Sequence, residues 1–334
     1  MLPTHKPMVR KLILDTDPGG DDIFSILWLL SFLKHKNIDL LAITTAAGNV
    51  PARNTFNAAC QILRLSEVDD IVVGRGVALP EQLFSHASHI HGSDGMGNLS
   101  QTLPPGRRRF ADSPPSEKLI IDLLNRYPGE VTIVGIAPLT NLAIAENQAP
   151  GTLRKAKEIV IMGGAFNVPG NVTPVAEFNI AFNVKAAQQV FASRSDMVML
   201  PLDVTRQLVF TSEMIADLVA DYPESKLVEF MAKLVEFLTR TSLEHRETKG
   251  ERGFVIHDAV AIAYLFYPEL LTFKRGQVMI ETQGKFTTGQ TLLDNRHGVK
   301  SGFNAWVATA VDSHNLMACL VQDLTSLVER VHHN

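Results

Sequence analysis

The sequence predicts an α/β protein built on one mostly parallel central sheet with helices on both faces. Short apolar runs alternate with longer helical patterns over the first two-thirds of the chain, and polar clusters follow several of the apolar runs. This alternation is typical of βαβ units that pair parallel strands. No linker, repeat or low-complexity segment divides the 334 residues. We therefore expect a flexible N-terminus over residues 1–10 and a single domain over residues 11–330.

The first strand is predicted at Lys11–Leu14, followed by an acidic turn and a helix at Ile23–Leu33 whose first turn Asp21 and Asp22 cap. The same cycle predicts the later elements, in chain order: strand Leu40–Thr45, helix Ala52–Leu65, strand Ile71–Val73, helix Glu117–Arg126, strand Val131–Ile136, helix Thr140–Glu146, strand Glu158–Met162, helix Lys185–Ala192, strand Met197–Leu202 and helix Ala259–Phe266.

Three segments have weaker patterns. Gly74–Ser116 is broken by glycine and proline, and a long irregular segment in a compact domain is commonly functional. Ser212–Glu247 is mainly helical in pattern. The C-terminal part is β-rich near Gln277–Thr282 and ends in a helix from about Ser313.

Composition excludes several classes of protein. With 46% hydrophobic and 20% charged residues and a formal net charge of −4, the chain is neither disordered nor fibrous, and no general polyanion-binding role follows. Arg107–Arg109 is the dense basic run, and a solvated loop is favoured there over a nucleic-acid contact because no aromatic residues are interleaved. We expect no nucleic-acid partner.

Location is indicated by the cysteines and the N-terminus. Cys60 and Cys319 are too few for a disulfide framework, which suits a reducing compartment, and Met1–Arg10 is not a signal peptide. The longest apolar run, Ile23–Leu33, is far shorter than the roughly 18 residues that a membrane span requires. We expect a cytoplasmic protein with no membrane contact.

The most informative segment contains Asp15, Asp17, Asp21 and Asp22. Four carboxylates so close together repel one another, and a helix N-terminus, at about 0.3–1 kcal/mol per charge, stabilises too little. A bound cation is the natural solution, and oxygen ligands favour calcium or magnesium over zinc. The alternative is that Asp21 and Asp22 only cap a helix while the other two are solvated.

Other polar groups also follow predicted strands. Asn171, Glu177 and Asn179 suit the hydroxyl groups of a polyol, although such asparagines can instead bond their own backbone. Taken alone, His257 and His91 are ordinary loop residues and Asp258 is a helix N-cap. No phosphate-binding glycine loop, nucleophile elbow or zinc-protease helix is present in the sequence.

Taken together, these segments resemble the inosine-uridine-preferring nucleoside hydrolase family. The octet Asp15–Asp22 is similar to its N-terminal signature, and the resemblance continues in order through Thr44–Asn49, Pro138–Asn141, Met162–Gly164, Glu177–Ile180 and His257–Asp258. It implies a Rossmann-like nucleoside hydrolase fold, and hydrolysis of the N-glycosidic bond of ribonucleosides to free base and ribose, with a bound calcium ion.

The resemblance also implies roles for individual residues. It makes Asp17, Asp22, Asp258 and the backbone carbonyl of Ile136 ligands of calcium, with Asp17 also the acceptor of the proton of the attacking water. The remaining residues would bind substrate: Asp21 and Asn179 at the 2′ and 3′ hydroxyls, Asn171 and Glu177 at the 5′ hydroxyl, Asn49 in the pocket wall, His257 as the acid for the leaving base and His91 as a base contact.

Some questions stay open at this level. Thr241 and His245 stand where some members place aromatic or amide side chains, so purine, pyrimidine and mixed preferences are all compatible. The resemblance further implies a homo-oligomer, a dimer or a tetramer. The alternatives are a non-catalytic calcium and ribose-binding module, or a metal-dependent phosphatase suggested by Asp15-Thr16-Asp17, which lacks the downstream lysine expected of one.

Overall fold

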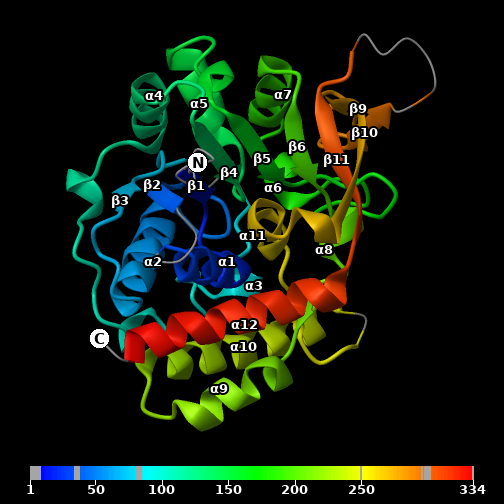
Figure 1. Cartoon of the computed structure of the whole chain (residues 1–334). Coiled ribbons are helices and arrows are strands. Elements are labelled where there is room, and N and C mark those ends of the chain that lie inside the picture. The colour runs from blue at the N-terminus through cyan, green and yellow to red at the C-terminus, as the bar shows by residue number, and fades with distance from the viewer. Residues whose placement is uncertain are drawn as a thin grey trace, which may run out of the picture.

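A nine-stranded sheet crosses the centre of the protein in the computed structural model, which describes residues 9–33, 38–79, 85–248, 250–294, 296 and 302–332 (Figure 1). The strands, in chain order, are β1 (Arg10–Thr16), β2 (Ile38–Thr45), β3 (Val72–Gly74), β4 (Val131–Gly135), β5 (Glu158–Met162), β6 (Met197–Leu200), β9 (Leu271–Ile280), β10 (Thr291–Asp294) and β11 (Ala305–Val311). A separate two-stranded sheet pairs β7 (Val209–Phe210) with β8 (Phe254–Val255).

The order of the large sheet is β10-β9-β11-β6-β5-β4-β1-β2-β3. Neighbours from β3 to β11 pair in parallel, whereas β9 is antiparallel to both β11 and β10. The chain moves outward from β1 through β2 to β3 and then returns to place β4 on the other side of β1. Ligands of open α/β sheets bind at such a reversal, beyond the carboxyl ends of the strands.

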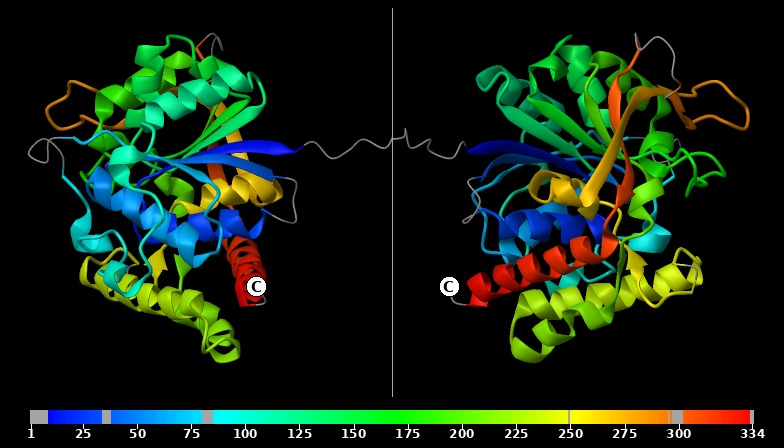
Figure 2. Two further views of the ribbon diagram at one scale, coloured as in Figure 1. Left: turned by 90° about the vertical axis from the view of Figure 1, so that its left-hand side faces the viewer. Right: turned by 45° about the vertical axis from the view of Figure 1, so that its right-hand side comes forward.

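Helices cover both faces of the sheet, as Figure 2 shows in two further views. One face carries α4 (Ser116–Arg126), α5 (Thr140–Gln148) and α7 (Val184–Ser193), and the other carries α1 (Gly20–Ser31), α2 (Ala52–Leu65) and α11 (Ala259–Phe266). Alternation along the strands separates the two cores: Ile133 of β4 packs with the first set, and the next residue, Val134, packs with the second. Both residues are fully buried, as expected for a parallel sheet covered on both sides.

The remaining helices complete the second layer or cross the loops. Among them, α12 (Ser313–His332) packs on α1. Helix α10 (Lys226–Glu244) lies on the outer side of α12, and α9 (Ala216–Asp221) packs against α10 (Figure 1). Short helices occur in the loops: α3 (Ser88–His91), α6 (Phe178–Phe182) and α8 (Leu202–Thr205). Within the ranges described above, no helix combines the length and the apolar character that crossing a membrane requires.

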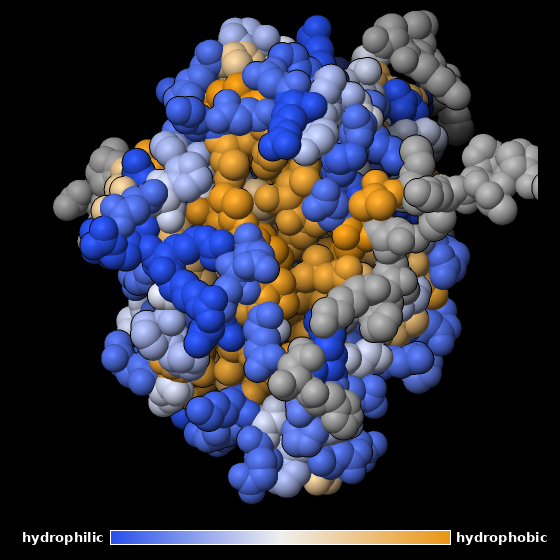
Figure 3. Space-filling model, turned by 60° about the vertical axis from the view of Figure 1, so that its left-hand side comes forward, coloured by the Kyte–Doolittle hydropathy of each residue, from blue (hydrophilic) through white to orange (hydrophobic). Residues whose placement is uncertain are grey.

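The edge of the sheet at β3 lies on the left of Figure 1. Figure 3, which brings that side forward, shows an apolar area between zones of polar side chains. Val72 of β3 contributes to the exposed apolar surface, with 39% of its surface accessible. The cleft described below opens elsewhere, at the carboxyl ends of the strands.

The predicted mostly parallel sheet with helices on both faces is confirmed, and α2 has the predicted bounds. Several other boundaries differ by one to three residues. For example, α1 begins at Gly20, before the predicted Ile23, and β6 ends at Leu200, because Pro201 and α8 follow directly. The sequence analysis did not predict α6, β7, β8, β10 or β11. Of the N-terminus predicted to be flexible, residues 1–8 lie outside the described ranges, and Arg10 already belongs to β1.

Candidate active site

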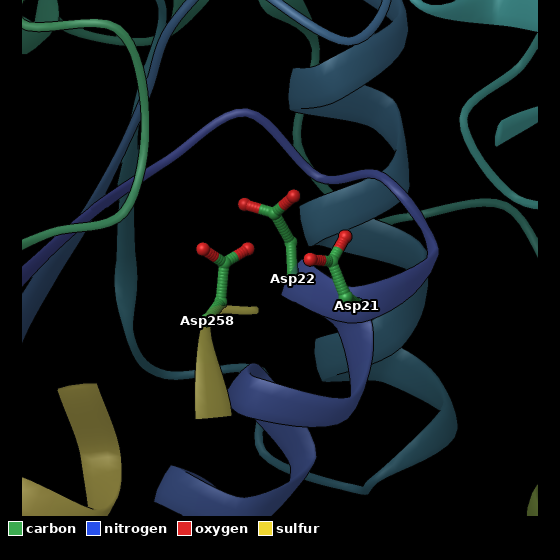
Figure 4. A group of neighbouring side chains, drawn as sticks. All are labelled: Asp21, Asp22 and Asp258. Carbon is green, nitrogen blue, oxygen red and sulfur yellow. The ribbon is translucent and has the colours of Figure 1, made fainter. Parts of the chain in front are cut away.

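A group of buried carboxylates lies where β1 ends and α1 begins. Asp21 and Asp22 come from the first turn of α1, and Asp258 is the residue before α11. Figure 4 shows the three side chains gathered beside one another, and one oxygen of each lies within 4.8 Å of the others. None of the three is more than 8% exposed. Together with Asp17, they form what we call the carboxylate floor.

Asp17 lies in the loop between β1 and α1, with only 1% of its surface exposed. Its Oδ2 atom accepts a hydrogen bond of 2.7 Å from the backbone N–H of Asn49, while its buried Oδ1 atom has no hydrogen-bond partner among the described residues. A Cβ atom at Gly48 would lie 2.0 Å from Oδ2, so glycine is needed there for the close approach. A buried acceptor without a partner costs about 1–3 kcal/mol, which indicates that a ligand completes the site.

Asp22 is held by neutral donors. Its Oδ1 atom accepts a bond of 2.6 Å from the Thr16 hydroxyl, and its Oδ2 atom accepts bonds from the Gly19 N–H at 3.0 Å and the Asn49 Nδ2 at 2.9 Å. Asn49 also donates to the backbone carbonyl of Asp17 at 3.1 Å. Asn49 therefore ties the loop after β2 to both acidic residues.

Charge in the carboxylate floor is not neutralised by any cationic side chain, since no ion pair within the described ranges involves these residues. Burial raises the pKa of Asp21 and of Asp22 to about 7. Burial and the neighbouring carboxylates also raise the pKa of Asp17 and of Asp258 well above the usual range. The arrangement therefore favours either protons or a cation between these oxygens.

A cleft of about 1160 Å³ opens above the carboxylate floor. Every candidate from the sequence analysis lines it except Asp17 and Asp22, which lie beneath; the lining candidates are Asp21, Asn49, His91, Ile136, Asn171, Glu177, Asn179, His257 and Asp258. The segments after β1, β2, β3, β4 and β5 and the turn before α11 supply them. The structure thus brings together residues that are far apart in the chain.

Glu177 and Asn179 form one wall of the cleft at the start of α6. The Glu177 carboxylate caps that helix by accepting bonds from the Asn179 and Ile180 N–H groups, and it also accepts one from the Gly164 N–H at 3.0 Å. The Asn179 amide donates to the backbone carbonyl of Ile136 at 3.1 Å. Asn171 is more exposed, and its Oδ1 atom accepts a bond of 2.9 Å from the Phe178 N–H.

Histidines line the rest of the cleft, and we call His89, His91, His245 and His257 the histidine rim. The Nδ1 atom of His91 accepts a bond of 3.0 Å from the Gly20 N–H, which links the rim to the start of α1. The rings of His89 and His245 lie edge to face, with centroids 5.0 Å apart. Burial, with smaller effects of Arg206 and His91, lowers the pKa of His257 to about 3, so its ring is neutral at pH 7.

A sequence model described as inosine-uridine preferring nucleoside hydrolase matches residues 12–318. The chain belongs to that family. Among curated relatives, the inosine-uridine preferring nucleoside hydrolase of Leishmania major is 36% identical over 320 residues, covering 95% of this chain and 97% of its own. Probable uridine nucleosidase 1 of Oryza sativa subsp. japonica is 35% identical over 317 residues, covering 92% and 94% respectively.

Solved structures agree with this nucleoside hydrolase in fold. A plant nucleoside hydrolase superposes with a TM-score of 0.84 at 32% identity, covering 95% of this chain and 99% of its own. A purine-preferring ribonucleoside hydrolase from Gardnerella vaginalis gives a TM-score of 0.87 at 27% identity, covering 96% and 100%. The predicted family, fold and enzyme class are therefore confirmed.

Of the polar residues at the site of this nucleoside hydrolase, the sequence analysis named Asp15 and Asp21 but not Thr205. One oxygen each of Asp21, Asp22 and Asp258 lies within 4.8 Å of the other two. Asp21, which the sequence analysis expected to bind a sugar hydroxyl, therefore also lies beside two of the expected metal ligands. Asp15 lies behind the floor and accepts bonds from Thr44 and Asn141. Thr205, which contacts His257, had no signal in the sequence, because a threonine becomes informative only when its partner is known.

Proposed function

We propose that this protein hydrolyses the N-glycosidic bond of ribonucleosides to free base and ribose in a calcium-dependent reaction. One observation carries the proposal: four buried carboxylates cluster at a cleft that two of them line, and within the described ranges none has a cationic partner and the Oδ1 atom of Asp17 has no hydrogen-bond donor. Membership of the family supports the reaction class.

The residues present fit a hard cation. Asp17, Asp22 and Asp258, with the backbone carbonyl of Ile136, would hold it, and each of these groups offers oxygen, the ligand atom that calcium prefers. The orphaned Oδ1 of Asp17 and the raised carboxylate pKa values support the same assignment. When bound, calcium supplies positive charge that lowers the pKa of a coordinated water and orients sugar hydroxyls.

Asp17 is the proposed base. It accepts the proton of the attacking water, because its carboxylate is held on one side by the Asn49 N–H and keeps the other oxygen free. Breaking a glycosidic bond passes through a sugar with oxocarbenium character. The negative floor beneath the ribose stabilises positive charge that develops mainly in the transition state.

Asp21 and Asn179 are proposed to bind the 2′ and 3′ hydroxyls, and Asn171 and Glu177 the 5′ hydroxyl. The Glu177 carboxylate has about four acceptor positions and uses three on backbone N–H groups, which leaves one for a hydroxyl. Its backbone contacts also fix its orientation, so binding requires little reordering. Asn49 completes the pocket wall.

His257 is the proposed group that neutralises the departing base, and His91 is a proposed contact to that base. Since the neutral form of His257 predominates at pH 7, hydrogen-bond donation is the contribution available to it there. Base preference depends on this part of the cleft rather than on the floor.

The test is release of ribose from inosine, adenosine, guanosine, uridine and cytidine, with calcium present. We expect release from at least one purine or pyrimidine ribonucleoside, and the ratio of kcat/KM across the five defines the base preference. A correctly folded protein that releases ribose from none of them contradicts the proposal.

We also propose that the protein is cytoplasmic, acts in purine or pyrimidine salvage and forms a homo-oligomer, either a dimer or a tetramer. The oligomeric state is tested by light scattering coupled to size-exclusion chromatography, where a monomer at micromolar concentration contradicts it.

A further inference from the structure

The side chain of Thr205 contacts His257, one of the four residues of the histidine rim. Thr205 ends α8, directly after β6, and is completely buried, while the ring of His257 lines the cleft. The Thr205 hydroxyl and the Nδ1 atom of His257 are 2.7 Å apart, a normal hydrogen-bond distance. This contact joins the carboxyl end of β6 to the turn that carries Asp258.

Burial decides which partner donates the proton. Within the described ranges, the Thr205 hydroxyl has no hydrogen-bond partner other than His257. If Nδ1 carried the proton, the buried Thr205 O–H would have no acceptor, whereas donation from Thr205 to Nδ1 satisfies both groups. A buried unsatisfied donor is strongly disfavoured, so the arrangement selects donation by Thr205.

A neutral imidazole carries one proton, and the nitrogen that accepts leaves the other as the donor. With Nδ1 accepting from Thr205, the proton of His257 is on Nε2. Nε2 has no hydrogen-bond partner within the described ranges, and the ring lines the cleft. The donor of His257 is therefore available to a ligand.

We propose that Thr205 is a positioning residue that fixes His257 in the Nε2–H tautomer and so presents a hydrogen-bond donor to the leaving base. The proposal rests on the proposed ribonucleoside hydrolysis and deepens it. It also defines the chemistry at this point of the cleft: the base must offer an acceptor there, such as a purine ring nitrogen or a pyrimidine carbonyl oxygen.

Hydrolysis breaks the bond between the sugar and the base and adds the elements of water to the two products. As the bond between the sugar carbon and the base nitrogen breaks, its electron pair moves onto the base, and water supplies a hydroxyl group to the sugar and a proton to Asp17. The Nε2–H group stabilises the charge on the base by hydrogen bonding, and no proton leaves His257. The base later takes up the proton that water supplied.

The kinetic test compares two kinds of leaving group. Thr205→Val keeps the shape of the side chain and removes the hydroxyl, and Thr205→Ser keeps the hydroxyl. With inosine and uridine we expect Thr205→Val to lower kcat by roughly 10- to 100-fold with little change in KM, as is usual for partners that orient a functional histidine. With p-nitrophenyl β-riboside, whose leaving group is a stable anion, we expect a change below about threefold, because no donor is needed.

Thr205→Ser should restore nucleoside turnover to within about threefold of the original. Thr152→Val is the matched control, since Thr152 is also buried but lies outside the cleft, and its hydroxyl has no hydrogen-bond partner in the described part of the chain. Equal losses on nucleosides and on the nitrophenyl riboside would show a structural role and overturn the proposal, as would unchanged nucleoside turnover. If the unaltered protein cleaves neither kind of riboside, the proposed function itself fails.

A second measurement does not depend on activity. Long-range correlation of ring nitrogens and carbon-bound protons by NMR on the unaltered protein distinguishes the two tautomers, with His257→Gln identifying the signals. We expect a protonated Nε2 and an unprotonated Nδ1 in His257. A proton on Nδ1 overturns the proposal.

Discussion

The carboxylate floor and the histidine rim face the same cleft but are built differently. The floor follows directly from β1 and from the turn before α11, is almost completely buried and is fixed by backbone and neutral side-chain donors. The rim comes from the short α3, the end of α10 and the loop before α11, and His89 and His245 are exposed. The carboxylates proposed to act on the water, the cation and the ribose thus lie on the buried floor, and the histidines proposed to meet the base lie on the rim, which is partly exposed.

Loss of the floor should have the largest effect. We expect Asp17→Ala to lower kcat/KM by roughly 1000-fold or more for every nucleoside, because it removes the base for the attacking water. The protein should stay folded, since the change also removes a buried orphaned oxygen. Ribose release and circular dichroism measure the two properties.

Asp122→Ala, which changes an exposed acid of α4, is the control and should behave like the original protein. Turnover by Asp17→Ala at the original rate excludes Asp17 as the base.

Metal removal should produce the next largest effect, and it should depend on pH. The pKa of Asp21 and of Asp22 is raised from 3.8 to about 7 in the fold, so the metal-free protein binds these protons more tightly than the unfolded chain. Their contribution to stability is therefore complete below about pH 4 and is lost as the pH rises through about 7. In chelator, Tm should be lower at pH 8 than at pH 6, and added calcium should raise Tm more at pH 8.

Asp21→Asn is the matched variant, because it removes one of the two titrations, and it should reduce the difference in Tm between the two pH values. Thermal unfolding followed by fluorescence measures both proteins. A metal-free Tm that rises from pH 6 to pH 8 contradicts the raised pKa values of the buried Asp21 and Asp22.

Substitution of His91, which links the carboxylate floor to the histidine rim, should have an intermediate effect on turnover. His91→Ala removes the acceptor for the Gly20 N–H and a proposed contact to the base, so we expect a loss of roughly tenfold in kcat/KM. Calcium affinity, measured by calorimetry, should change by less than about twofold, because no proposed ligand is altered. A large loss of calcium affinity would mean that floor and rim are not separable.

Change at the outer rim should have the smallest effect and the most selective one. His245 is exposed, and its ring contacts the ring of His89. His245→Ala should therefore change kcat/KM for some nucleosides, and the change should be less than about threefold. The informative quantity is the ratio of inosine to uridine turnover, which should shift. An equal change for both nucleosides would contradict a role for the rim in base preference.

The sequence determined the part of the protein that depends on local pattern. The alternation of strands and helices predicted the sheet, because central strands such as β4 and β5 are short apolar runs buried on both faces, whereas the helices between them are longer and have polar residues at helical spacing. Crowding of Asp15, Asp17, Asp21 and Asp22 within eight residues predicted a cation site, since mutual repulsion is a property of short separations along the chain. Resemblance of ordered segments added Asp258, which is more than 200 residues away from that group.

Tertiary structure alone decided which of these groups meet and in what state. The reversal of strand order between β1 and β4 places Ile136 beside the acidic loop, and the orphaned Oδ1 of Asp17 exists only because the loop is buried around it. Thr205 and His257 come from β6 and α11 ends that the sheet brings together, and burial fixes where the proton lies. Hydrogen-bond accounting and burial require three-dimensional neighbours, and these carry no periodic signal in the chain.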